Sequence, residues 1–317
     1  MAAKCKHTPV LLKECIKLLN IKPNGIYIDA TAGMGGHAAA ILSHLDKGQL
    51  ICIDCDNFAI ETLKNKFATN KNVKVIKSNF SDIDTKLKNE SIKYVDGILA
   101  DLGVSSPMFD VANRGFSYKL DGKLDMRMDQ DQKLNAWFIV NKYSYERLVE
   151  LFTKYGEAKE SRKVAKAICY YRDNKSIDTT SQLVEIIKNA VSVKTIYKKK
   201  HPARIYFQAL RIAVNDELNK LNKFIKLACE FLSYGGRLAI ISYHSLEDRI
   251  IKNTFNKLTT SLIPIEVPII DQDIKYSLVN KHPIVPSEQE IISNNRARSA
   301  KLRVIMCDDK SRGVAHV

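Results

Sequence analysis

The chain has 317 residues, of which 45% are hydrophobic, so it can bury cores for two domains and is neither disordered nor fibrous. Lys and Arg number 50 against 35 Asp and Glu, a formal charge of +15. This excess favours a polyanionic partner, although a lysine-rich solvated surface gives the same count. Seven scattered cysteines predict reduced thiols in a cytoplasmic protein, and no apolar run is long enough to span a membrane.

The first hundred residues alternate between short apolar runs and helical segments. We expect strands at 26–28, 49–53, 73–76 and 95–102, with helices at 37–45 and 58–67 between them. Strands that alternate with helices form parallel sheets, so this part predicts a Rossmann-like α/β fold.

A long polar segment interrupts this alternation from about residue 107 to 207. Segments 144–152, 157–172 and 181–191 have the periodicity of amphipathic helices. Because neighbouring strands of such a sheet are seldom a hundred residues apart, we expect a helical domain inserted into the sheet domain. Between Asp110 and Arg204 it has 20 Lys and Arg against 12 Asp and Glu, about half of the whole excess.

The α/β pattern resumes after the insert. We expect a helix at 208–232 that Gly235 and Gly236 terminate, followed by strands at 237–242 and 302–307. The predicted domains are therefore a sheet domain, 1–108 with 208–317, and a helical insert, 109–207.

A glycine-rich turn follows the first expected strand. Between Asp29 and the first helix it contains Gly33, Gly35, Gly36 and His37. Glycines let a ligand approach the backbone, and a helix N-terminus offers free N–H groups. Asp54 ends the next strand about 20 residues on, where an acid can hold ribose hydroxyls; Asp56 is the rival acid. Ordinary tight turns are the alternative explanation.

Four successive strand ends carry side chains suited to an adenosine ligand, namely Asp29, Asp54, Phe80 and Asp101. The carboxyl ends of parallel strands form the ligand crevice of such sheets. The glycine spacing departs from the dinucleotide pattern and there is no Walker lysine, which disfavours NAD and nucleoside triphosphates. The pattern favours S-adenosylmethionine, an adenosine with a charged sulfonium tail.

Cys52 and Cys55 have the spacing of some metal sites. Both fall in or beside an expected strand, where side chains three positions apart point to opposite faces. No second such pair exists to complete a zinc site, so we expect both thiols to be structural and no metal to be bound.

Eight segments together resemble the RsmH (MraW) family of bacterial methyltransferases. They span nearly the whole chain in the family's order and are 7–12, 35–37, 101–107, 114–117, 124–128, 207–212, 242–249 and 295–303. The resemblance implies a class I methyltransferase sheet with an inserted helical domain. It further implies methyl transfer to the N4 amino group of a cytidine in the decoding region of small-subunit (16S) ribosomal RNA, within the 30S particle.

The resemblance also implies which residues contact the cofactor. They are Gly35, Gly36, His37, Asp54, Phe80, Asp101 and Met108. Family members can carry Gln at position 108, whereas Met can pack against the cofactor but offers no amide. The glycine turn also differs from the family at 31–34, where relatives often carry bulkier or basic residues. We expect its backbone contacts with the cofactor to be kept.

Asp101 and His244 are the candidates for a catalytic role. The lone pair of a cytosine amino group is delocalised, so an acceptor for its N–H would help, and Asp101 or nearby carbonyls suit this. Alternatively, Asp101 only holds the cofactor. His244 could contact substrate or move a proton, or with Glu247 it could cap the next helix.

Two basic clusters are candidates for RNA contact. The first is 198–201 with Arg204, in the insert, and the second is Arg296, Arg298, Lys301 and Arg303. A solvated surface is the alternative for the second. Other function classes are an assembly factor that keeps a cofactor fold without turnover, and a methyltransferase for small molecules, which the basic insert disfavours.

Overall fold

The computed structural model describes residues 9–197, 200–260 and 274–313, which fall into two compact units. The first unit is Met1–Gly103 with Leu218–Val317, and the second is Val104–Glu217. The second unit thus begins before and ends after the expected insert, 109–207. His7, Lys198 and Lys199, which belong to motifs noted above, lie outside the described residues.

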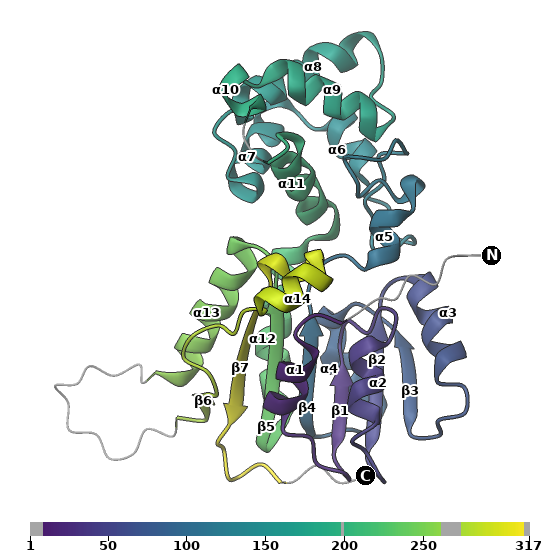
Figure 1. Ribbon diagram of the computed structural model, residues 1–317, viewed down its shortest axis with the longest axis vertical. Coiled ribbons are helices and arrows are strands. Elements are labelled where there is room, and N and C mark those ends of the chain that lie inside the picture. The colour runs from purple at the N-terminus through teal and green to yellow at the C-terminus, as the bar shows by residue number, and fades with distance from the viewer. Residues whose placement is uncertain (1–8, 198–199, 261–273, 314–317) are drawn as a thin grey trace, which may run out of the picture. The chain divides into compact units, whose positions relative to one another are not determined.

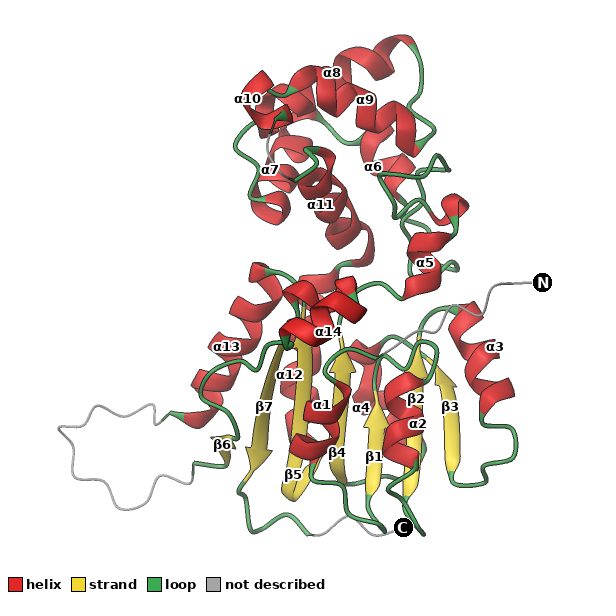
Figure 2. Ribbon diagram, viewed as in Figure 1, coloured by secondary structure: helices red, strands yellow, loops and turns green. Residues whose placement is uncertain are grey.

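A seven-stranded sheet forms the centre of the first unit, in the order β3-β2-β1-β4-β5-β7-β6 (Figure 2). The strands are β1 (Ile26–Asp29), β2 (Gln49–Asp54), β3 (Val73–Lys77), β4 (Val95–Asp101), β5 (Leu232–Ser242), β6 (Tyr276–Leu278) and β7 (Lys301–Cys307). Strands β1 to β5 are parallel, and β7 is antiparallel to both β5 and β6. The predicted Rossmann-like sheet is confirmed.

Helices cover both faces of this sheet, because alternate strand residues point to opposite sides. Ile51 and Ile53 share one core with α4 (Ile83–Asn89), α12 (Glu217–Glu230) and α13 (Ser245–Thr259). Leu50 and Cys52 share the other with α1 (Leu12–Leu19), α2 (Gly36–Leu42) and α3 (Asn57–Lys66). In Figure 1, α1 and α2 lie in front of the strands, on the viewer's side of the sheet. The remaining helices of this unit are η1 (Phe80–Asp82), α14 (Glu288–Ser293) and η3 (Asn295–Ser299).

The prediction of one continuous helix at 208–232 is wrong. The chain instead forms α11 (Ala203–Asn215) and α12, which are separated by Asp216 in a left-handed conformation with φ 52°. The side chain of Arg211 pairs with Glu217 across this break, with N–O distances of 2.9 and 2.8 Å. Gly235 and Gly236 do not cap a helix: they lie within β5, where the pairing with β4 shifts register between Val95 and Gly97.

The described part of the second unit is helical apart from its loops and one isolated β-bridge. Its helices, in chain order, are α5 (Ser106–Asp110), η2 (Ala112–Arg114), α6 (Ala136–Lys142), α7 (Tyr145–Gly156), α8 (Ser161–Asn174), α9 (Thr180–Ala190), α10 (Val193–Ile196) and α11. They enclose a core of their own that includes Phe152, Ile168, Leu183 and Leu210. The amphipathic segments expected at 144–152, 157–172 and 181–191 correspond to α7, α8 and α9.

Among the described residues, no helix combines the length and the apolar character needed to cross a membrane.

Candidate cofactor site

The glycine-rich turn joins β1 to α2 and is fixed to the end of β2. The N–H of Gly33 donates to Asp54 Oδ2 at 2.8 Å. Gly35 has φ 70°, and a Cβ there would lie 2.9 Å from the Leu63 side chain. A Cβ on Gly36 would lie 2.4 Å from Pro9 Cγ. Close packing inside the protein therefore requires glycine at both positions, and the turn is held against the sheet.

Asp54 ends β2 and holds the loops on both sides of it. Its Oδ2 accepts from Gly33, and its Oδ1 accepts the N–H of Asp56 at 2.9 Å. Burial raises the pKa of the Asp54 carboxyl, and these backbone donors partly oppose the rise. Each carboxylate oxygen has two lone pairs, so acceptor capacity remains for a ligand. Asp56, the rival acid, is 1% exposed and precedes α3.

Asp101 ends β4 and is bound on both of its sides. Its N–H donates to Thr31 Oγ1 at 2.6 Å, and its Oδ1 accepts the Tyr243 hydroxyl at 2.6 Å. Burial raises the pKa of Asp101, which His37 and the Tyr243 hydrogen bond partly offset. Within the described residues, Oδ2 has no hydrogen bond and lies 3.9 Å from His37 Nδ1. This oxygen is therefore available to a donor on a ligand.

His37 is buried at the start of α2, beneath the turn. Its Nε2 lies 2.9 Å from the carbonyl oxygen of Val10, so Nε2 carries a proton and donates. This leaves Nδ1 on the side of Asp101. The ring therefore binds the segment before α1 and lies near the carboxylate at the end of β4.

Phe80 lies in η1, directly after β3. Asn79 caps η1 by accepting the N–H of Ser81 at 3.1 Å. The Phe80 ring packs edge-to-face against Phe224 of α12, with centroids 5.1 Å apart. This contact fixes the orientation of the half-buried Phe80 ring. The ring follows β3, the neighbour of the strand that ends at Asp54.

Asp29 ends β1 and is 1% exposed. Burial raises the pKa of its carboxyl to about 6, although His37 and a hydrogen bond from the Thr31 N–H act in the opposite direction. Asp29, Asp54 and Asp101 thus lie at the carboxyl ends of three parallel strands, all with raised pKa values. Within the described part of the chain, no Lys or Arg side chain forms an ion pair with any of them. Apart from His37, which lies 3.9 Å from Asp101, the three carboxyl groups therefore have no cationic partner among the described residues.

Replacing Asp29 by asparagine is expected to stabilise the ligand-free protein at high pH. The folded-state pKa of about 6 lies above the usual value of about 4, so Asp29 favours folding fully only below pH 4 and loses that contribution as the pH rises through 6. At pH 8, Asp29→Asn should raise the free energy of unfolding by up to about 3 kcal/mol. Urea unfolding at pH 5 and 8 measures this.

The exposed Asp46, changed to asparagine, is the matched control for the lost charge. Equal free energies of unfolding for the Asp29 variant and the wild type at pH 8 would show that the buried Asp29 carboxylate does not destabilise the fold.

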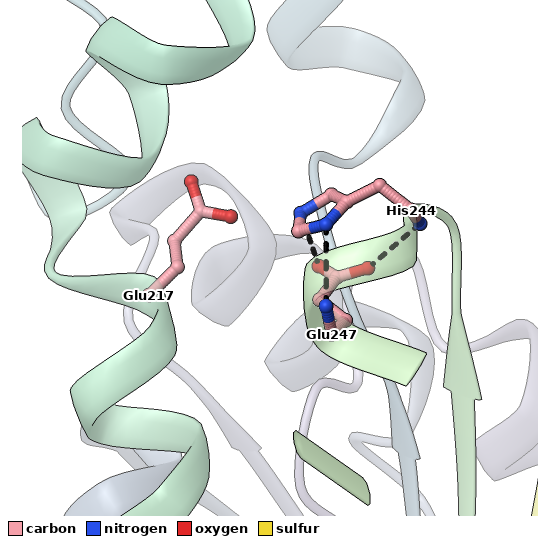
Figure 3. A group of neighbouring side chains, drawn as sticks. All are labelled: Glu217, His244 and Glu247. Atoms are coloured by element: carbon pink, nitrogen blue, oxygen red, sulfur yellow. Dashed lines mark hydrogen bonds and ion pairs between the residues drawn. The ribbon is translucent and has the colours of Figure 1, made fainter. Parts of the chain in front are cut away.

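His244 caps the helix that follows β5 (Figure 3). Its Nδ1 accepts the N–H of Glu247 at 3.3 Å, while Glu247 Oε2 accepts the N–H groups of Tyr243 at 2.8 Å and His244 at 3.2 Å. The Nε2 of His244 lies 3.2 Å from Glu247 Oε1. The structure thus shows the capping network that was the alternative to a catalytic role.

Residues 4–307 match the family model described as the MraW methylase family. The chain belongs to the MraW methylase family. This confirms the resemblance found in the sequence.

Two relatives of this MraW-family chain are similar over nearly their whole length. A protein of Ureaplasma urealyticum named Ribosomal RNA small subunit methyltransferase H is 52% identical over 299 residues, covering 94% of this chain and 97% of its own. A protein of Streptococcus mutans with the same name is 48% identical over 305 residues, with 94% and 96% coverage. A solved rRNA methylase from Streptococcus thermophilus is similar with TM-score 0.40 and 12% identity, over 92% and 91% of the two chains.

Met108 differs from the other predicted cofactor residues of this MraW-family chain in its location. It belongs to the second unit, where its side chain is 4% exposed and packs in the apolar core of that unit. The first unit brings together Gly35, Gly36, His37, Asp54 and Asp101 through the contacts described above. Cofactor contact by Met108 stays a prediction.

Tyr243 was not among the predicted site residues. It directly precedes the candidate His244, yet its hydroxyl is the group that binds Asp101. Burial, followed by the charge of Asp101, raises the pKa of Tyr243 well above its ordinary value, so the hydroxyl keeps its proton and donates.

The basic cluster near the C-terminus is only partly available to RNA. Lys301 and Arg303 both pair with Asp248, at 3.0 and 2.7 Å. Arg296 and Arg298 are exposed. Half of this cluster therefore neutralises a carboxylate of the same unit.

Proposed function

We propose that this chain transfers a methyl group from S-adenosylmethionine to the N4 amino group of a cytidine in the decoding region of small-subunit ribosomal RNA. Membership of the MraW methylase family and the name shared by its two relatives support methylation of small-subunit rRNA. The observation that carries the proposal is the set of three carboxylates at neighbouring strand ends, of which Asp29 is buried and Asp54 and Asp101 are half-buried. N4 of cytidine and the decoding region come from the family resemblance.

The residues present fit S-adenosylmethionine. A ligand with a sulfonium and an ammonium would compensate the negative charge of Asp29, Asp54 and Asp101, whose pKa values burial raises. We propose that Asp54 accepts hydrogen bonds from the ribose hydroxyls with its remaining lone pairs. The half-buried Phe80 ring offers an apolar face to the adenine.

The bound cofactor supplies a methyl group on a positively charged sulfur. In the transfer the carbon–sulfur bond breaks and its electron pair stays on sulfur, a bond from the methyl carbon to N4 forms, and the proton lost from the amino group passes to solvent. The protein aligns the amino nitrogen with the methyl carbon. It also accepts a hydrogen bond from the amino N–H, which makes the delocalised lone pair of the nitrogen more available for attack. Asp101 Oδ2 is suited to accept a hydrogen bond, either from the cofactor's ammonium or from the amino group of the base.

We propose that the helical second unit recognises the RNA. The segment from Asp110 to Arg204 supplies about half of the chain's excess positive charge, and phosphate contacts by Lys and Arg dominate affinity for nucleic acid. Its core is separate from that of the sheet, so it forms a surface of its own.

The proposal is tested with radiolabelled S-adenosylmethionine and small ribosomal subunits from cells that lack the modification. We expect label in the RNA of these subunits, and none in subunits that already carry the methyl group. Label on DNA or on small molecules alone would show that the RNA proposal is wrong. Tight binding of the subunits without any transfer would instead indicate an assembly factor.

A further inference from the structure

Two aromatic rings from distant parts of the second unit stack on each other. Tyr118 and His201 have centroids 5.0 Å apart and ring planes 16° from parallel. Phe207 of α11 packs edge-on against Tyr118, with centroids 6.0 Å apart. The imidazole is thus held in a fixed orientation by the half-buried Tyr118 ring, which in turn packs on the buried Phe207.

The hydrogen bonds of His201 determine which ring nitrogen carries the proton. Its Nδ1 accepts the N–H of Ala203 at 3.2 Å, so the neutral ring has its hydrogen on Nε2. Among the described residues, Nε2 has no partner. It is therefore a hydrogen-bond donor that remains available on a half-buried ring.

The charges around His201 are positive. Burial lowers the pKa of His201, and the ammonium groups of Lys188 and Lys119 lower it further. Lys119 directly follows Tyr118, and both lysines are exposed. In the described part of the chain, none of the groups that shift the pKa of His201 is a carboxylate. Two ammonium groups and one imidazole N–H donor thus lie on this part of the second unit.

We infer that Lys119, Lys188 and His201 form a binding site for a phosphodiester group of the RNA backbone on the second unit. A phosphodiester has only acceptor oxygens and a negative charge, which complement two ammonium groups and one imidazole N–H. A protein surface would present donors as well as acceptors. The inference rests on the proposed function, since it assigns the place where the second unit holds its RNA.

The experiment measures binding of unmethylated small ribosomal subunits to the full-length protein over a range of salt concentrations, with no methyl donor present. Lys119→Gln with Lys188→Gln should lower the slope of log affinity against log salt by about 1, because the contact with one phosphate is lost. Lys142→Gln with Lys154→Gln removes the same charge from exposed lysines that lie over Trp137 and Tyr155, and should change the slope less.

His201→Asn tests the imidazole separately. The amide oxygen of Asn can still accept the Ala203 N–H, but the variant has no donor at the place of Nε2. We expect a loss of affinity of several-fold, on the order of one hydrogen bond to a charged group. His201→Gln, which places an N–H near that position, should recover part of it.

Equal slopes and affinities for the two double variants would overturn the inference. So would a loss of affinity for intact subunits that is absent for protein-free small-subunit RNA, because the surface would then contact a ribosomal protein. Both results concern binding alone, whereas the proposed function is tested by whether and where a methyl group is transferred to the RNA.

Discussion

Replacing Asp54 by alanine is expected to weaken binding of S-adenosylmethionine by at least about 100-fold. Two hydrogen bonds from ribose hydroxyls to a buried carboxylate would be lost, and each is worth about 1.5–3 kcal/mol because the acceptor is charged. The change also removes the acceptor for Gly33 and Asp56, so the glycine turn loses its attachment to β2. Isothermal titration calorimetry gives the dissociation constant directly.

Two further variants separate ligand contact from general damage. Asp54→Asn keeps an acceptor oxygen but loses the charge, and should fall between the alanine variant and the wild type. Asp46→Ala removes an exposed carboxylate before β2 and should leave the affinity unchanged. If Asp54→Ala stays folded and binds the cofactor as tightly as the wild type, Asp54 does not belong to the site.

Replacing Asp101 by asparagine is expected to weaken cofactor binding by about 10–100-fold, because one charge-assisted hydrogen bond from the cofactor's ammonium to Oδ2 is lost. If the partner of Oδ2 is instead the cytidine amino group, the affinity is retained and kcat at saturating cofactor falls. Calorimetry and steady-state kinetics on small ribosomal subunits distinguish the two roles.

Tyr243→Phe is the matched variant for this test, because it removes only the hydroxyl that binds Oδ1 at 2.6 Å. It should lower affinity or rate less than Asp101→Asn does, because the carboxylate and its Oδ2 remain in place. Normal affinity and normal kcat for Asp101→Asn would contradict both roles of Asp101.

The strand ends could be predicted from the sequence because each is a local pattern. A short apolar run that ends in an acid marks β1, β2 and β4, and parallel pairing then places Asp29, Asp54 and Asp101 at one edge of the sheet. The glycine turn could also be predicted from the sequence. Its packing against Pro9 and Leu63 was not, because these contacts depend on the tertiary fold.

The error in the helix at 208–232 also has a physical cause. The apolar periodicity continues across Asp216, yet this residue is left-handed and the Arg211–Glu217 pair spans the break. Gly235 and Gly236 resemble a helix cap in sequence. Pairing with β4 overrides this local preference and extends the strand back to Leu232.

Tyr243 could not be predicted because its partner is remote. It lies 142 residues from Asp101 along the chain, and only the pairing of β4 with β5 brings them together. His244, by contrast, could be singled out from the sequence because it lies in an unusual polar segment. Its ring contacts Glu247, only three residues away.

The most direct test of the account is the identity of the methylated nucleoside. Small subunits from cells without this protein are treated with the purified protein and S-adenosylmethionine, and their RNA is digested and analysed by mass spectrometry. We expect N4-methylated cytidine in the fragment that contains the decoding region, and none when the protein is omitted. A methyl group on another base, or on cytidine at C5 or the ribose, would contradict it.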